Sequence, residues 1–213
     1  MGMVHSTDLS DYAAKMRRLA HSSTDLEVDA RFIDMIVPRK STVLDIGCGI
    51  GSAVAALRRA EHRAFGIDPN PEVLQVAREL FDSVWFRQLS ATDLSPGTMP
   101  DHQLPKRFDL ILMSGNVPAF LTRVELARAF ATADELLAPG GRLVVGTTTH
   151  RRGGPVDLDH CAAGTSLRLE HRYGDWHLGA FDSDSPWSVS VYSALGTRRT
   201  ADGPDGIHAL PPE

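Results

Sequence analysis

A glycine-rich segment connects an apolar stretch to an expected helix, and its residue types suit the binding of a small charged ligand. Residues 43–51 read VLDIGCGIG. Glycines in such a turn let the backbone adopt positive φ values and approach a ligand closely. Asp45, two residues before the first glycine, adds a carboxylate that suits an ammonium group and would sit badly beside a pyrophosphate. The segment therefore predicts a ligand-binding turn that recognises an ammonium group.

The elements that must position this turn alternate between strands and helices. Short apolar stretches predict parallel strands over 42–46, 63–67, 84–88, 108–113 and 142–147. Helices are expected over 51–60 and 121–137, and between them Val73, Val76, Ala77 and Leu80 form an apolar stripe at helical spacing. A turn is expected at Pro139-Gly140-Gly141. The alternation predicts a doubly wound α/β fold with helices on both faces of the sheet.

The two ends of the chain differ from this middle part. Amphipathic helices are expected over 10–20 and 27–37, so residues 1–38 are predicted to form an N-terminal helical cap. After His150 we expect a short helix over 157–163 and an antiparallel strand pair over 166–173 and 187–195. The main domain then spans 39–195, and the sparse apolar content of 196–213 predicts a flexible tail.

Composition excludes several classes of protein. The 213 residues carry a net charge of −5, and the basic residues occur as scattered pairs, which disfavours a nucleic-acid partner. No apolar run has the roughly 18–20 residues that a membrane helix needs. The two cysteines lie far apart and no histidine pair has metal-ligand spacing, so no metal site is expected. We expect a cytoplasmic protein, either a monomer or a homodimer.

Two classes of ligand compete for the glycine turn. A dinucleotide-binding turn has the pattern G-x-G-x-x-G, but here Ser52 occupies the position of the third glycine. The chain also lacks a Tyr-x-x-x-Lys catalytic pair. An NAD(P)-dependent oxidoreductase is therefore the less favoured alternative.

Over residues 40–150 the sequence resembles the class I S-adenosylmethionine-dependent methyltransferases. The resemblance rests on VLDIGCGIG, FGIDPNPEVL, FDLILMSGN and LLAPGGRLVVG. It implies a Rossmann-like, mostly parallel sheet, S-adenosylmethionine as cofactor, and methyl transfer as the reaction. A non-catalytic module that binds S-adenosylmethionine is a further alternative.

The resemblance also implies roles for the cofactor-binding residues. Asp45 would face the methionine ammonium group, and Gly47, Cys48, Gly49 and Gly51 would line the amino-acid and ribose end. Asp68 would accept hydrogen bonds from both ribose hydroxyls, although by itself it is also a candidate cap of the next helix.

The resemblance likewise implies which residues lie at the adenine end and at the methyl end of the cofactor. Pro69 would contact the adenine face, and Ser90 occupies the position where the family usually has an acid for the adenine amino group. The Ala91 amide would serve the adenine ring nitrogen. Ser114 and Asn116 would border the methyl group.

Methyl transfer from a sulfonium is an in-line displacement that depends mainly on alignment, and it needs a base only for a protonated acceptor. No catalytic constellation stands out, so the catalytic candidates are Asn116, His150 and His177. The substrate candidates are Tyr12, Met16, Asn116, Phe120 and Trp176, with Arg151 also expected above the sheet. The lack of a separate recognition domain predicts a small-molecule acceptor.

Overall fold

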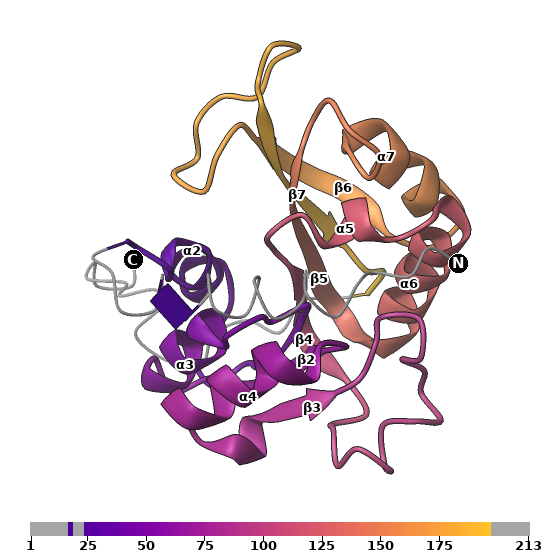
Figure 1. Ribbon diagram of the computed structural model, residues 1–213. Coiled ribbons are helices and arrows are strands. Elements are labelled where there is room, and N and C mark those ends of the chain that lie inside the picture. Colours follow the sequence, from indigo (N-terminus) through magenta and orange to yellow (C-terminus); the bar gives the residue numbers. More distant parts are fainter. Residues whose placement is uncertain (1–16, 19–23, 197–213) are drawn as a thin grey trace, which may run out of the picture.

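The structure is a computed structural model that describes residues 17–18 and 24–196 (Figure 1). Its helices are α2 Val28–Ile36, α3 Ser52–Arg59, α4 Pro71–Leu80, the 3-10 turn η1 Ser83–Trp85, α5 Val117–Phe120, α6 Arg123–Leu136 and α7 Pro155–Ala163. Its strands are β1 Thr42–Ile46, β2 Arg63–Asp68, β3 Phe86–Gln88, β4 Phe108–Met113, β5 Leu137–Thr148, β6 Arg168–Tyr173 and β7 Trp187–Ser193.

These strands form one sheet in the order β3-β2-β1-β4-β5-β7-β6. The first five strands in this order run parallel to one another, whereas β7 runs antiparallel to both β5 and β6. This arrangement confirms the predicted fold class. The chain moves outward from β1 to β3 and then crosses to β4, so the order reverses between β1 and β4. Ligands of open α/β sheets bind at such a reversal, beyond the carboxyl ends of the strands.

Two apolar layers cover the two faces of the sheet. Leu44 and Ile111 face the layer that contains Phe130 of α6 and Leu158 of α7. Their neighbours in the chain, Val43 and Leu110, face the opposite layer, which contains residues of α2, α3 and α4. Because successive strand residues point to opposite faces, apolar runs in β1 and β4 fill both layers at once. Figure 1 shows the same division, with α2, α3 and α4 lying apart from α6 and α7.

Two local predictions were wrong. The expected strand over 84–88 begins only at Phe86, because the Asp82 side chain accepts a hydrogen bond of 3.1 Å from the Val84 amide and closes a 3-10 turn. The expected turn at 139–141 is part of β5, which begins at Leu137. The pairing of β5 with β4 shifts register between Phe108 and Leu110, and this irregularity accommodates the glycines within the strand.

The termini lie mostly outside the described residues. The helix expected over 10–20 is described only at residues 17–18, and Tyr12 and Met16 fall outside. Of the expected tail, only Gly196 is described. Among the described residues, no helix is both long and apolar enough to cross a membrane.

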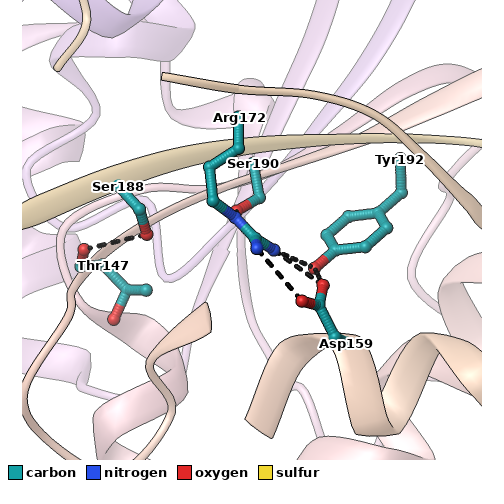
Figure 2. Close-up of polar contacts among 6 residues, drawn as sticks. All are labelled: Thr147, Asp159, Arg172, Ser188, Ser190 and Tyr192. Carbon is teal, nitrogen blue, oxygen red and sulfur yellow. Dashed lines mark hydrogen bonds and ion pairs between the residues drawn. The ribbon is translucent and has the colours of Figure 1, made fainter. Parts of the chain in front are cut away.

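A polar network, partly buried beneath α7, holds this helix against the antiparallel strands (Figure 2). The Arg172 guanidinium donates hydrogen bonds to both carboxylate oxygens of Asp159, at 2.7 and 3.0 Å, and to the Ser190 hydroxyl at 2.8 Å. The fully buried Tyr192 donates its hydroxyl to Asp159 at 2.7 Å and accepts from Arg172 at 3.0 Å. The network fixes α7, and therefore also the loop that precedes it, relative to the sheet.

Candidate functional site

The glycine turn after β1 is tied to the end of β2. The amides of Gly47 and Cys48 both donate to the carbonyl oxygen of Ile67, at 2.8 and 3.0 Å. Gly49 has a φ of +55°, and a Cβ added there would meet no atom within 4 Å. The backbone at Gly49 therefore borders open space at the carboxyl edge of the sheet, as a ligand-binding turn requires.

Asp68 lies beside this turn at the end of β2. Its Oδ2 accepts a hydrogen bond of 3.1 Å from the Gly49 amide, and its Oδ1 accepts one of 2.9 Å from the Asn70 amide. Burial raises the pKa of Asp68, and the two hydrogen bonds offset only part of that effect. The N-cap of α4 is Asn70, whose side chain accepts from the amides of Glu72 and Val73. Asp68 is therefore not the cap, and its carboxylate keeps acceptor capacity for a ligand.

Asp45 is a buried carboxyl group whose Oδ1 has no hydrogen-bond partner among the described residues. Burial raises its pKa well above the ordinary value, and the nearby charges of Asp29 and Asp68 raise it further. An unpartnered buried acceptor is costly, so such groups often belong to a ligand site. A positively charged, hydrogen-donating group of a ligand would satisfy Asp45, and this requirement fits the ammonium group of S-adenosylmethionine.

The Cys48 thiol is buried beside the turn. Burial raises the pKa of its thiol well above the usual range, and the charges of Asp45 and Asp68 raise it further. Its side chain packs over Gly66 of β2, where an added Cβ would lie 2.6 Å from the Cys48 Sγ. Cys48 therefore remains a neutral thiol at the turn.

Asp29 is a further candidate site residue, which the sequence did not indicate. It lies in the first turn of α2, near Asp45 and near Ser114, the residue that follows β4, and its Oδ1 accepts a hydrogen bond of 2.8 Å from the Ala30 amide. Burial raises the pKa of Asp29, and the nearby Ser114 side chain and the Ala30 amide offset part of the rise. The only sequence signal was an acid in the first turn of a helix, which is too common to indicate a site.

Ser90 and Ala91 follow β3, beside Asp68. The Leu89 amide donates to the Asp68 carbonyl oxygen at 3.2 Å, which holds the two strand ends together. The Ser90 hydroxyl accepts from the Thr92 amide at 3.2 Å and shares a bond of 2.9 Å with the Thr92 hydroxyl. Ser90 therefore already forms a local turn, and Ala91 is buried beside it. Pro69 is exposed at the end of β2.

Asn116 connects the ends of β4 and β5. Its φ is +68°, and its side-chain oxygen accepts from the Thr148 amide at 2.7 Å and from the Thr147 hydroxyl at 3.3 Å. The next residue, Val117, packs directly against Gly47, where an added Cβ would lie 2.4 Å from the Val117 Cγ2. The segment after β4 therefore contacts the glycine turn, as expected for residues that border one site.

The other predicted substrate and catalytic residues have fewer contacts with the glycine turn at the carboxyl edge of the sheet. Trp176 packs edge-on against Phe32 of α2 at a centroid distance of 5.5 Å, and it covers Gly146 of β5. His150 and His177 are both exposed. Within the described ranges, no group of three or more histidine, cysteine or acidic side chains is arranged to hold a metal ion.

Comparisons with known proteins agree with this geometry. A family described as "Methyltransferase domain" matches residues 44–143. The chain is 34% identical over 119 residues to the demethylmenaquinone methyltransferase of Tropheryma whipplei strain Twist, which covers 52% of this chain and 43% of that protein. It is 31% identical over 139 residues to the ribosomal protein L11 methyltransferase of Pelobacter propionicus, with 63% and 40% covered. The chain thus spans less than half the length of either relative.

Solved structures agree as well. The structure resembles a TehB-like SAM-dependent methyltransferase from Corynebacterium glutamicum, with a TM-score of 0.79, 28% identity, and 89% of this chain and 100% of that chain covered. It also shares the fold of the CcbJ methyltransferase from Streptomyces caelestis, with a TM-score of 0.67, 19% identity, and 79% and 94% covered.

Proposed function

The chain belongs to the class I S-adenosylmethionine-dependent methyltransferases, and we propose that it transfers a methyl group from S-adenosylmethionine to a small-molecule acceptor. The observation that carries this proposal is the pair of carboxyl groups at the carboxyl edge of the sheet. Asp45 has a buried oxygen without a partner, and Asp68 lies beside the open backbone of Gly49. Together they provide acceptors for the ammonium and hydroxyl groups of this cofactor.

When bound, S-adenosylmethionine supplies a methyl group activated by a sulfonium centre. The residues of this chain hold and align the reactants, since alignment alone contributes several kcal/mol to such reactions. Asp45 holds the ammonium group and Asp68 the ribose hydroxyls, with Gly47, Cys48, Gly49 and Gly51 lining the amino-acid and ribose end. Pro69, Ser90 and Ala91 border the adenine, and Ser114 and Asn116 border the methyl group.

A proton acceptor is needed only if the methyl acceptor enters protonated. Asp29 is the carboxyl group that lies beside Ser114, and we include it among the candidates for this role. Asn116 is held by Thr148 and acts as a positioning residue. His150 and His177 remain weaker candidates because both are exposed.

The proposal also covers the domain bounds, the cellular location, the oligomeric state and the partners. We assign the catalytic domain to residues 39–195. The cap predicted over residues 1–38, with the substrate candidates Tyr12 and Met16, lies mostly outside the described residues. The enzyme acts in the cytoplasm as a monomer or homodimer without a nucleic-acid partner. The two cysteines support a reducing compartment because both are buried and free.

Calorimetric titration with S-adenosylhomocysteine, S-adenosylmethionine and NAD tests the cofactor. Micromolar binding of the two adenosyl ligands alone, weakened about ten-fold or more in Asp68→Ala, is the expected result. Binding of NAD would instead favour an oxidoreductase. Binding of the adenosyl ligands without methyl transfer to any acceptor in a screen would favour a non-catalytic binding module.

A further inference from the structure

A pocket of about 710 Å³ lies beside α5, at the edge of the sheet where β4 and β5 end. Its lining residues are Asn116, Ala119, Phe120, Thr148, Arg151 and Arg152. Small-molecule sites in proteins typically have volumes of roughly 300–1,000 Å³, so a small acceptor fits this space.

The pocket is adjacent to the cofactor turn. The short helix α5 forms one wall through Ala119 and Phe120, and its first residue, Val117, packs against Gly47. Asn116, which the family resemblance places near the methyl group, lines the same pocket. A molecule in this pocket therefore lies next to the segment that borders the methyl end of the cofactor site.

Two guanidinium groups give the pocket its chemical character. Arg151 and Arg152 are both exposed, and within the described part of the chain neither has a carboxylate within ion-pair distance. Arg152 donates one hydrogen bond of 2.9 Å to the Ala119 carbonyl oxygen, which leaves other N–H donors available. Glu125 is the acid whose charge interacts with Arg152, but its carboxylate caps α6 through Thr122. The pocket is therefore basic in a chain with a net charge of −5.

The loop that carries the two arginines is held in place from both sides. Gly153 packs on α5, where an added Cβ would lie 2.6 Å from the Pro118 carbonyl carbon. The helix that follows, α7, is fixed to the sheet through Asp159 and Arg172 (Figure 2). Because the backbone of this loop is packed in this way, the positions from which the two arginine side chains extend are preorganised.

Phe120 adds an apolar contact surface. Phe120 is 78% exposed although it lines the pocket. A large apolar side chain with such exposure beside two cations suits a ligand that has both an apolar body and a negative group.

We propose that this pocket binds the methyl acceptor, and that the acceptor carries a carboxylate or phosphate group held by Arg151 and Arg152 beside an apolar or aromatic body that contacts Phe120. The proposal rests on the methyltransferase function proposed above. It narrows the acceptor from any small molecule to an anionic one.

The test is calorimetric titration of the protein saturated with S-adenosylhomocysteine. The probes share one ring and differ in charge: benzoate and phenyl phosphate are anionic, benzyl alcohol is neutral and benzylamine is cationic. We expect only the anionic probes to bind, and Arg151→Ala/Arg152→Ala to weaken them about ten-fold or more. The matched control is Arg63→Ala, which removes an exposed guanidinium at the beginning of β2, on the opposite edge of the sheet.

Charge reversal tests the proposal through a change of ligand preference, which general destabilisation of the protein would not produce. Arg151→Glu/Arg152→Glu should bind benzylamine and no longer bind benzoate, while its affinity for S-adenosylhomocysteine stays at the wild-type value. Equal binding of benzoate by the wild type and the double alanine variant would overturn the proposal, as would failure of both anionic probes to bind the saturated wild type. Failure of S-adenosylhomocysteine itself to bind is the separate result that contradicts the cofactor assignment.

Discussion

The carboxylate of Asp68 accepts a hydrogen bond of 3.1 Å from the backbone amide of Gly49, which joins the turns that follow β1 and β2. The Asp68 side chain therefore positions the glycine turn in addition to offering oxygen acceptors to a ligand. Substitutions at this position change both the turn and the binding of the cofactor.

We expect Asp68→Ala to weaken binding of S-adenosylhomocysteine by about ten-fold to a hundred-fold, because charge-assisted hydrogen bonds are lost. Asp68→Asn keeps one acceptor oxygen and should lose less. Calorimetric titration measures both. Asp82→Ala is the control, since it removes a carboxylate that caps only the 3-10 turn before β3. Unchanged affinity in Asp68→Ala would remove Asp68 from the binding site.

Asp45→Asn should stabilise the protein without ligand and weaken its binding of the cofactor. Burial raises the pKa of Asp45 well above 3.8, so the folded state holds a proton that the unfolded state releases. Wild-type stability therefore falls as pH rises from about 4, toward and through the raised pKa, whereas the asparagine variant lacks this dependence. Thermal unfolding from about pH 4 to pH 8 measures the effect.

We expect the melting temperatures of Asp45→Asn and the wild type to differ by an amount that increases with rising pH. For a chain of this size, about 1 kcal/mol of stability corresponds to roughly 2–4 °C in melting temperature. Titration with S-adenosylmethionine should show weaker binding by Asp45→Asn at neutral pH. A variant that melts below the wild type at neutral pH would contradict this account of Asp45.

Gly47→Ala should destabilise the fold. Its φ is +76°, where an L residue costs about 1–2 kcal/mol, and the added Cβ would lie 2.4 Å from the Val117 Cγ2. Denaturant unfolding measures the loss. The control is Gly97→Ala, where the added Cβ meets only Ser95 Oγ at 3.7 Å. Combining Gly47→Ala with Val117→Ala should relieve the steric part of the loss, and no relief would show that the backbone conformation accounts for all of it.

Tyr192→Phe should reduce the free energy of unfolding by about 1 kcal/mol, because the buried hydroxyl that bridges Asp159 and Arg172 is lost. Tyr173→Phe on the neighbouring strand is the control, since no hydrogen bond of the Tyr173 hydroxyl is found among the described residues. Urea unfolding compares the two, and equal effects would show that the network adds no stability.

The same network predicts that the free energy of unfolding decreases at acid pH. Burial raises the pKa of Asp159, but hydrogen bonds from Arg172 and Tyr192 outweigh that effect, and the net pKa lies below 3.8. Its contribution is therefore present above the ordinary pKa of aspartate and is lost as pH falls through the lowered value. Asp159→Asn should flatten the unfolding free energy in this acid range. Because Asp159 is partly exposed, we expect a modest effect.

Local sequence determined most of the sheet and part of the site. The alternation of apolar strands and amphipathic helices depends on residues that are close together in the sequence. For this reason β1, β2, β4 and the turn at 47–51 could be predicted. The hydrophobic pattern of one segment cannot predict an irregularity in strand pairing, because the irregularity depends on the partner strand. The continuation of β5 through 139–141 therefore emerged only from its pairing with β4.

Tertiary structure decided which distant groups meet. Asp29 lies 16 positions before Asp45 in the chain, and only the packing of α2 over the end of β1 brings the two carboxyl groups within electrostatic reach. The packing of Gly153 on Pro118 likewise places Arg152 against Ala119. The cofactor turn was predictable because its residues are adjacent in sequence. The acceptor pocket was not, because its walls come from segments that meet only once the sheet has formed.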